Sequence, residues 1–282
     1  MAETTRIEWA DATFNMVIGC SHVSPGCDNC YAEAMAHRRG WHDWSTGPRK
    51  TLSDAYWRQP LVWNRKAQAE GRPWRVFCSS LADVFDPLNP PEERHRLFEL
   101  IQRTPWLVWM LLTKRPQQIQ RFLPSDWSVE RYPNVWLGIT AEDQKHYDRR
   151  WPVLSGIDAT VRFVSYEPAL GPLNIGVHTR EHGDPDWLIW GGESGPRARR
   201  PDHRWIRHIT ALCQQHGIAV FGKQWGTYLA NPLSYAVSLD TVKEHDPPEN
   251  GKGGALLDGV LHREIPEVPL PCVLDELFAI SS

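Results

Sequence analysis

Short apolar runs recur along most of the chain at a nearly constant interval. Each run is apolar throughout rather than at every second position, which is the pattern of strands buried on both faces of a parallel sheet. The centres of neighbouring runs lie roughly 25 to 33 residues apart, the length of one strand plus a crossover helix. The runs are Trp74–Cys78, Trp106–Leu112, Val135–Ile139, Val161–Val164, Trp187–Trp190 and Ile218–Phe221, and Phe14–Ile18 is a candidate first strand before them.

Helical patterns fill the intervals between these runs. The segment Pro91–Arg103 begins with proline and two glutamates and continues with leucine and isoleucine at helical spacing, which is typical of a helix N-terminus. Further helices are predicted at Tyr31–Arg39, Leu61–Glu70, Pro116–Phe122, Asp143–Leu154 and Asp202–His216. The resulting seven βα-like units predict an α/β fold, a complete or partial (β/α) TIM-like barrel, with a doubly wound open sheet as the alternative.

We expect a single barrel domain over residues 1–226, since 282 residues is near the upper size of one hydrophobic core. Residues 41–73 are rich in tryptophan, proline and arginine and are interpreted as an insertion. The strand rhythm ends after Trp225. Residues 227–282 are therefore predicted to form an irregular C-terminal cap packed on the barrel.

Charge and terminal composition exclude several classes of protein. The net charge of −3 and the pI of about 6.5 give no whole-protein argument for nucleic-acid binding. The N-terminal segment has no apolar signal region and no run approaches membrane-spanning length, so we expect a soluble, cytoplasmic protein with no membrane partner. The cysteines outside the first thirty residues (Cys78, Cys213, Cys272) are scattered, which disfavours a secreted disulfide framework.

Three of the six cysteines, Cys20, Cys27 and Cys30, fall within eleven residues. The intervening Ser24-Pro25-Gly26 is typical of a turn, so the chain can fold back and bring the sulfurs together. Three thiolates on one loop suit zinc or an iron–sulfur cluster. A closed zinc site needs a fourth ligand, for which the candidates are His22, His37 and Cys78. A cluster held by three cysteines leaves one iron open for another ligand.

Polar residues follow each apolar run after the first. Parallel α/β folds place active sites at the carboxyl ends of their strands, so these residues are candidates for one polar site facing the cysteines. Because loops are polar in any protein, part of the set has this ordinary explanation. The candidates are Ser79, Asp83, Lys114, Arg115, Glu142, Ser165, Glu167, Gly191, Gly192, Glu193, Lys223 and Gln224.

Two of these stretches allow a ligand or a purely structural interpretation. The adjacent glycines Gly191 and Gly192 would let the backbone approach a ligand closely, or they would form a tight strand-to-helix turn. A basic cluster follows the run Trp187–Trp190 and consists of Arg197, Arg199, Arg200, Arg204 and Arg207. Such a cluster binds a phosphate-bearing substrate or is an ordinary solvated surface.

The spacing Cys20-x6-Cys27-x2-Cys30 at the head of a series of βα units resembles that of radical SAM enzymes, whose usual spacing is C-x3-C-x2-C. More closely, the chain resembles the phage-associated three-cysteine-motif family, a domain of unassigned function that is similar to radical SAM proteins. The matching stretches are Ile7–Trp9, Val23–Glu33, Leu112–Pro116, Val135–Gly138, Arg162–Pro168, Gly191–Gly195 and Lys223–Gly226.

This resemblance implies a [4Fe–4S] cluster on the three cysteines, with S-adenosylmethionine (SAM) bound to the open iron through its amino and carboxylate groups. Reductive cleavage of SAM would give a 5′-deoxyadenosyl radical that takes hydrogen from a substrate. The expected cofactor contacts are Tyr31, Ser79, Lys114, Ser165, Glu167, Gly191, Gly192 and Glu193. The expected substrate contacts are Asp83, Arg115, Glu142, Arg197, Arg199, Lys223 and Gln224.

The substrate implied by the phage association and the basic cluster is a nucleotide or nucleic acid, with repair or modification of a base as the reaction. Flavodoxin or ferredoxin is the expected electron donor. Two alternatives of other classes stay open. One is a zinc-stabilised nucleic-acid-binding protein without catalysis, and the other is a protein that uses its iron–sulfur cluster for structure or electron transfer alone.

Overall fold

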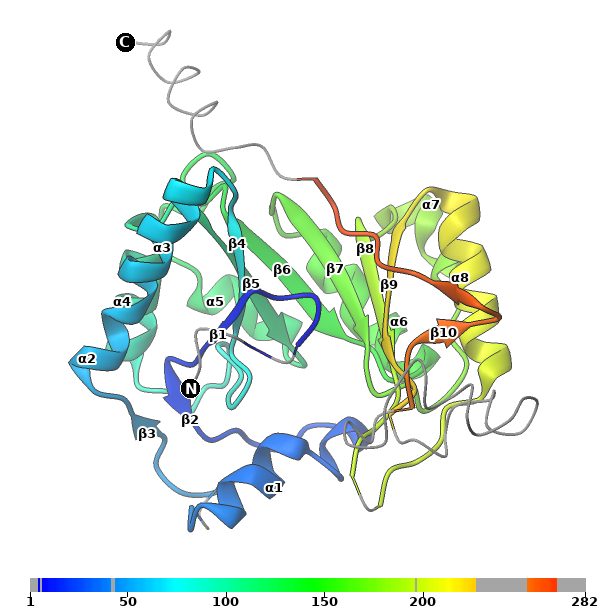
Figure 1. Ribbon diagram of the computed structural model, residues 1–282, viewed down its shortest axis with the longest axis horizontal. Coiled ribbons are helices and arrows are strands. Elements are labelled where there is room, and N and C mark those ends of the chain that lie inside the picture. The colour runs from blue at the N-terminus through cyan, green and yellow to red at the C-terminus, as the bar shows by residue number, and fades with distance from the viewer. Residues whose placement is uncertain (1–4, 6, 42–43, 196, 227–252, 268–282) are drawn as a thin grey trace, which may run out of the picture.

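A computed structural model describes residues 5, 7–41, 44–195, 197–226 and 253–267. Its main feature is a curled sheet of seven parallel strands with helices on the outer face (Figure 1). The strands stand in chain order across the sheet, with β1 and β9 at its two edges, so the predicted partial barrel is confirmed and the doubly wound alternative, which reverses its strand order, is excluded. The strands are β1 Ala12–Phe14, β4 Trp74–Cys78, β5 Leu107–Thr113, β6 Val135–Thr140, β7 Val161–Tyr166, β8 Trp187–Gly191 and β9 Ala219–Gln224.

The prediction of one continuous first strand at Phe14–Ile18 was wrong. The chain leaves the sheet at Asn15, where the side-chain oxygen accepts the backbone N–H of Leu81 at 2.6 Å. Val17–Ile18 then forms a separate strand, β2, which pairs antiparallel with β3 at Lys50–Thr51. A buried asparagine inside an apolar run therefore ends β1, because its side chain bonds to the loop after β4 and its backbone N–H donates to the hydroxyl of Tyr56.

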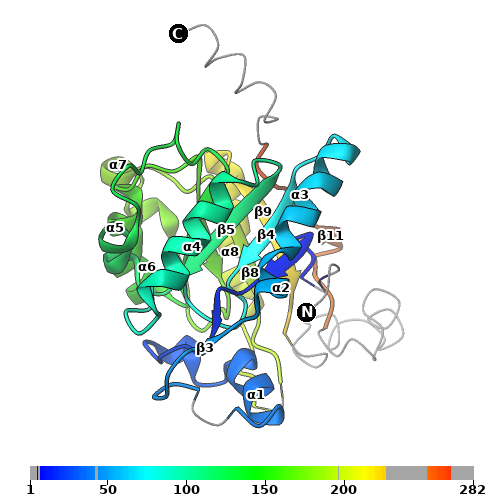
Figure 2. The same cartoon turned by 90° about the vertical axis from the view of Figure 1, so that its left-hand side faces the viewer.

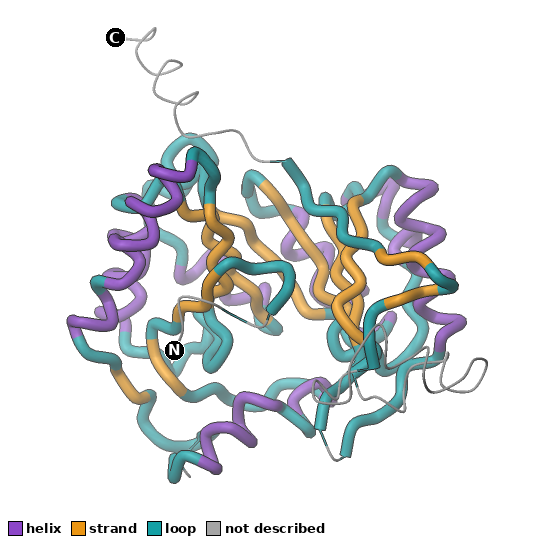
Figure 3. The backbone as a smooth tube through the Cα atoms, viewed as in Figure 1, coloured by secondary structure: helices purple, strands orange, loops and turns teal. Residues whose placement is uncertain are grey.

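Helices join consecutive strands on the outside of the sheet (Figures 1 and 3). The longest connection, between β1 and β4, ends in α3, which packs against β4 and β5 as an ordinary crossover helix although it lies in the range predicted as an insertion. The helices are α1 Tyr31–Arg38, α2 Asp54–Trp57, α3 Gln59–Glu70, α4 Pro91–Gln102, α5 Ile119–Phe122, α6 Gln144–Ser155, α7 Thr179–His182 and α8 His203–His216. Three 3-10 turns lie at Pro25–Cys27 (η1), Pro116–Gln118 (η2) and Ile175–Val177 (η3).

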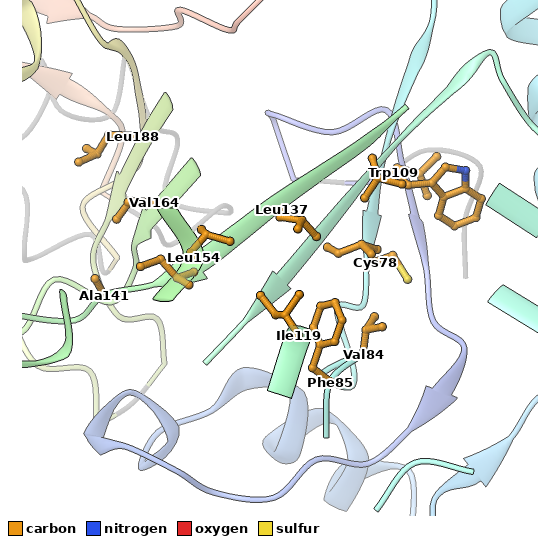
Figure 4. Packing of buried hydrophobic residues seen from close by; sticks show 14 of the residues in the cluster. Cys78, Val84, Phe85, Trp109, Ile119, Leu137, Ala141, Leu154, Val164 and Leu188 are labelled. Atoms are coloured by element: carbon orange, nitrogen blue, oxygen red, sulfur yellow. The ribbon is translucent and has the colours of Figure 1, made fainter. Parts of the chain in front are cut away.

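Between the sheet and the helices lies the larger core. Alternate strand residues contribute to it, because successive side chains in a strand point to opposite faces. Figure 4 shows part of this packing, with Cys78, Trp109 and Leu137 from three neighbouring strands. Cys78 is fully buried there, so it is a packing residue and not the fourth zinc ligand considered from the sequence.

The inner face of the sheet carries a second, mostly aromatic core. Trp9, from the segment before β1, lies 4.8 Å from Phe77 and 6.2 Å from Trp187 between ring centroids, and Trp136 lies 5.8 Å from Trp187. Phe221 on the far edge strand joins the same cluster. We call these five residues the aromatic floor, because they fill the interior of the partial barrel towards the amino ends of the strands.

The open side of the barrel is bridged by the two ends of the described chain. Glu264 donates its backbone N–H to the carbonyl of Val220 at 3.0 Å, which extends the sheet beyond β9. Arg263 forms an ion pair with Glu8 at 2.5 Å. Before this segment, β10 (Leu256–Leu257) and β11 (Val260–Leu261) form a short hairpin.

Residues 253–267 are the described part of the predicted cap, and residues 227–252 and 268–282 lie outside the described residues. None of the described helices is long and apolar enough to cross a membrane.

Candidate functional site

Polar side chains form a ring above the aromatic floor, at the carboxyl ends of the strands. Ser79 and Lys223, for example, follow the floor residues Phe77 and Phe221 by two positions, because side chains alternate along a strand. With Phe77 and Leu112 the polar side chains of the ring line a cavity of about 370 Å³, within the roughly 300–1,000 Å³ typical of small-molecule sites. The ring consists of Ser79, Lys114, Thr140, Ser165, Glu167 and Lys223.

Residues 20–30, here called the cysteine loop, pass across the same ends of the strands and lead into α1 (Figures 1 and 2). Gly19 enters the loop with φ of 118°, a left-handed conformation that favours glycine. The predicted turn forms the 3-10 turn η1, and Cys30 is the N-cap of α1. Cys20, Cys27 and Cys30 are free thiols and all three line the cavity.

Arg115, directly after β5, holds the start of the cysteine loop. Its Nη2 donates to the carbonyl oxygen of Ser21 at 2.6 Å, and its Nη1 lies 2.9 Å from Asp83 Oδ2 and 3.8 Å from Cys20 Sγ. Asp86 accepts the N–H of Ser21 at 2.9 Å and lies 3.3 Å from Arg115. The side chains of Arg115, Asp83 and Asp86 are buried, so the hydrogen bonds and ion pairs between them, and not contacts with solvent, fix the geometry of the network.

A second arginine joins the same network. Arg49 Nη2 lies 2.8 Å from Asp86 and 2.6 Å from Ser21 Oγ. Burial alone would raise the pKa of Asp86, but hydrogen bonds from backbone N–H groups and the charges of Arg115 and Arg49 hold that pKa below its usual value of 3.8.

The middle of the loop rests on Glu142, at the end of β6. This fully buried carboxylate accepts a hydrogen bond from Ser24 Oγ and lies 2.7 Å from Arg150 Nη1. A Cβ at Gly26 would lie 2.5 Å from Glu142 Oε1, so glycine is needed for this approach. Burial would raise the pKa of Glu142, but Lys114, Arg150 and Ser24 lower it, so the group stays ionised.

The end of the loop is bound by Glu193, after β8. Its Oε2 accepts from Asn29 Nδ2 at 2.9 Å, and its Oε1 lies 2.6 Å from Arg199 Nη2. Arg199 in turn donates to the carbonyl of Pro25 at 2.7 Å. Burial would raise the pKa of Glu193, but the hydrogen bonds from Arg199 and Asn29 lower it. Both carboxylate oxygens of Glu193 are therefore engaged in holding the loop.

The electrostatics around the cysteines differ from one thiol to another. Burial, reinforced by the negative charge of Asp83, raises the pKa of the Cys20 thiol to about 12. Burial also raises the pKa of Cys30, while the positive charge of Lys114 acts in the opposite direction. Binding of a metal centre by these thiols would therefore release protons, and Lys114 and Arg115 are positioned to offset the negative charge of thiolates.

Two further contacts organise the ring. Lys223 Nζ lies 2.9 Å from Glu167 Oε1, with Ser165 Oγ 3.4 Å from the other oxygen of that carboxylate. Lys114 Nζ lies 3.4 Å from Thr140 Oγ1. In the cavity, Lys223 on β9 is therefore ion-paired with Glu167. Lys114, across the sheet, forms its hydrogen bond to the neutral hydroxyl of Thr140.

Most of the residues predicted as contacts line this cavity, though the structure tests none of their roles. Those in the lining are Tyr31, Ser79, Asp83, Lys114, Arg115, Ser165, Glu167, Gly192, Glu193, Lys223 and Gln224, besides the three cysteines. Gly191, Glu142, Arg197 and Arg199 are not in the lining.

The glycine pair and the basic cluster have specific structural partners. The N–H of Gly192 is bonded to the carbonyl of Gln224 at 2.8 Å, and a Cβ at Gly191 would lie 2.5 Å from Glu167 Oε1. In the basic cluster, Arg204 is ion-paired with Asp202 and Arg207 with Asp258, each at 2.5 Å. Much of the basic charge predicted for that surface is therefore balanced.

Several residues that build the site were not predicted from the sequence. The inward orientation of Thr140 can be predicted from the alternation of side chains along a strand, but only once the bounds of β6 are known. Arg49, Asp86 and Asn29 act across long sequence separations, and no local pattern marks them.

The cysteines fit an iron–sulfur cluster by the chemistry of the donor set. They are three free thiols that line one cavity, with a cation near two of them. Within the described part of the chain, no three His, Cys, Asp or Glu side chains lie close enough to hold a single metal ion. A [4Fe–4S] cluster binds each thiolate to a different iron, so its ligands need not converge on one point.

Comparison with known proteins agrees with this architecture. The sequence matches the model of a family described as protein of unknown function (DUF5131) over residues 4–266. The chain belongs to this family. The family description carries no phage association, and the search of curated proteins found no match.

Among solved structures, a mutant of spore photoproduct lyase matches with a TM-score of 0.51 at 11% identity, over 78% of this chain and 79% of that chain. The same enzyme in complex with dinucleoside spore photoproduct matches with a TM-score of 0.49 at 10% identity, over 72% of this chain and 74% of that chain. Spore photoproduct lyase is a radical SAM enzyme, and the first likeness shows that this member of the family has the partial-barrel fold of that class.

Proposed function

We propose that this protein is a radical SAM-type enzyme in which Cys20, Cys27 and Cys30 hold a [4Fe–4S] cluster. SAM would occupy the cavity beside them. The observation that supports this most is that the three thiols line the same 370 Å³ cavity as the polar ring at the carboxyl ends of the strands. The fold shared with spore photoproduct lyase and the grouping of three cysteines between the first strand and the first helix agree with the proposal, although the first gap of six residues is longer than the usual three.

When bound, the cluster and SAM would supply a 5′-deoxyadenosyl radical that takes a hydrogen atom from the substrate. The residues of the chain would bind and orient the reactants. Lys114 is suited to the SAM carboxylate, because it faces the cavity beside Cys30 and forms no ion pair within 4.0 Å among the described residues, although its charge acts on Glu142. Glu167 and Ser165 are suited to the SAM amino group. The aromatic floor would exclude water from below.

For the substrate we propose a nucleotide or nucleic acid, whose base would be repaired or modified. Lys223 and Gln224 line the cavity and Arg197 is exposed beside the cysteine loop, where its carbonyl accepts from Asn29 at 3.0 Å. These groups would contact phosphate or base edges. Binding of DNA, RNA and free nucleotides should then weaken as salt is raised, and binding that is absent or indifferent to salt contradicts this part of the proposal.

The enzyme assignment is tested by anaerobic reconstitution with iron and sulfide, followed by incubation with SAM and dithionite. The expected result is 5′-deoxyadenosine and a brown chromophore that Cys27→Ala loses and Cys213→Ala, which removes a buried thiol far along the chain, retains. A flavodoxin or ferredoxin should replace dithionite. A reducible cluster that yields no 5′-deoxyadenosine would contradict the enzyme assignment and favour a cluster with a structural or electron-transfer role. Zinc in place of iron would favour the zinc-stabilised binding protein.

A further inference from the structure

Among the described side chains, Arg115 donates an N–H to the sulfur of one cysteine, whereas Lys114 acts on Cys30 through its charge. Arg115 Nη1 lies 3.8 Å from Cys20 Sγ, whereas within the described ranges no side-chain N–H contacts the sulfur of Cys27 or Cys30. The guanidinium cannot easily turn away. Its other contacts are Asp83 at 2.9 Å, Asp86 at 3.3 Å and the carbonyl of Ser21 at 2.6 Å.

We propose that Arg115 sets the reduction potential of the cluster by donating an N–H to the Cys20 thiolate. The inference rests on the proposed function, since it concerns the cluster that the three cysteines would hold. It gives Arg115 a positioning and tuning role in place of the substrate contact expected from the sequence.

The direction of the effect follows from charge. Reduction adds one electron to the cluster and increases the negative charge on its sulfur ligands, so an N–H donor at a ligand sulfur stabilises the reduced form and raises the potential. Arg115 is buried, with only 5% of its surface exposed, so water screens this contact weakly.

The contact with Cys20 Sγ is what distinguishes Arg115 from the other charged residues of this network. Arg115 and Arg49 carry two positive charges, and Asp83 and Asp86 carry two negative charges. The network is therefore close to neutral, and its long-range field at the cluster is small. Arg49 shares Asp86 and Ser21 with Arg115 but does not contact Cys20 Sγ. It provides the matched control.

The experiment is a potentiometric titration of the reconstituted cluster followed by EPR, in the wild type and in Arg115→Gln, Arg115→Lys and Arg49→Lys. Iron and sulfide are counted in each variant first. We expect Arg115→Gln to shift the reduction equilibrium at least tenfold towards the oxidised form, which is about 59 mV for one electron. Arg115→Lys should shift it in the same direction by a smaller amount, and Arg49→Lys should titrate like the wild type.

A wild-type potential in Arg115→Gln, with the cluster intact, overturns the inference, as does an equal shift in Arg49→Lys. If Arg115→Gln fails to fold or to hold a cluster, the test rests on Arg115→Lys. A wild-type potential in Arg115→Lys then overturns the inference. Failure of the proposed function looks different, because the wild-type protein itself would then bind no cluster, or would bind a reducible cluster that yields no 5′-deoxyadenosine from SAM.

Discussion

Asn29 and Glu193 are 164 residues apart in the sequence, and the amide nitrogen of Asn29 lies 2.9 Å from Glu193 Oε2. This bond joins the segment between the second and third cysteines to the end of β8. Arg115 after β5 and Glu142 after β6 hold the rest of the loop in the same way. The cysteine loop, although long, is therefore fixed at three points by the strand ends that surround the cavity.

Glu193→Ala is expected to weaken retention of the cluster about 10- to 100-fold, the usual cost of losing a group that orients metal ligands. The reason is that Asn29 and Arg199 would lose their shared acceptor. Iron release to a chelator measures the effect. Arg204→Ala removes an exposed arginine that, among the described residues, forms an ion pair with the nearby Asp202, and this variant should release iron at the wild-type rate. Unchanged iron retention in Glu193→Ala would show that this carboxylate does not hold the loop.

Gly26→Ala should prevent the loop from docking, because the added methyl group would lie 2.5 Å from the Glu142 carboxylate. The barrel itself should remain folded by circular dichroism, while the iron content after reconstitution falls to near zero. The control is Gly156→Ala, where the nearest atom to the new Cβ is 3.7 Å away. Full iron loading of Gly26→Ala would contradict the described path of the loop.

Asp86→Asn is expected to cost about 3 kcal/mol of unfolding free energy at pH 7, because Arg49 and Arg115 would lose a buried charge partner. The folded-state pKa of Asp86 lies below its usual 3.8, so its contribution is present above that value and is lost as the pH falls through the folded-state pKa. Urea unfolding of the two proteins across this pH range measures the difference.

The stability gap between wild type and Asp86→Asn should accordingly be constant near neutrality and narrow in acid. Asp158→Asn, which changes an exposed carboxylate outside this network, corrects for the general effect of removing an acid. A gap that persists unchanged in acid would mean that the ionised form of Asp86 is not what stabilises the loop.

Lys114→Gln should weaken SAM binding about tenfold or more, since a hydrogen bond to a charged group contributes roughly 1.5–3 kcal/mol. Calorimetry on the reconstituted, oxidised protein measures this without turnover. Lys145→Gln, on the exposed face of α6, removes the same charge away from the cavity and should bind SAM like the wild type. Equal SAM affinities for the wild type, Lys114→Gln and Lys145→Gln would show that Lys114 does not bind SAM.

The sequence predicts the barrel well because each buried strand is apolar along its whole length. Six of the seven apolar runs match strands to within three residues at each end. The exception is the first run, where Asn15 bonds to Leu81 in a loop 66 residues away. Tertiary hydrogen bonding of this kind has no local signature, so a buried polar residue that ends a strand looks like part of the run.

The site is predictable as a set of strand ends but not as a set of contacts. The rule that active sites lie at the carboxyl ends of parallel strands places Ser79, Lys114 and Glu167 around one cavity. It cannot separate residues that face the cavity from those that hold the loop, such as Glu142. That difference depends on which side chains the folded cysteine loop covers, and this is decided by bonds between distant segments.

The central claim is that the three cysteines hold a cluster with one iron open to SAM. The most direct measurement is the EPR spectrum of the reconstituted, reduced protein before and after addition of SAM. We predict the signal of a reduced [4Fe–4S] cluster whose g-values change when SAM is added. A protein that takes up zinc in place of iron, or a cluster whose spectrum SAM leaves unchanged, would contradict the account.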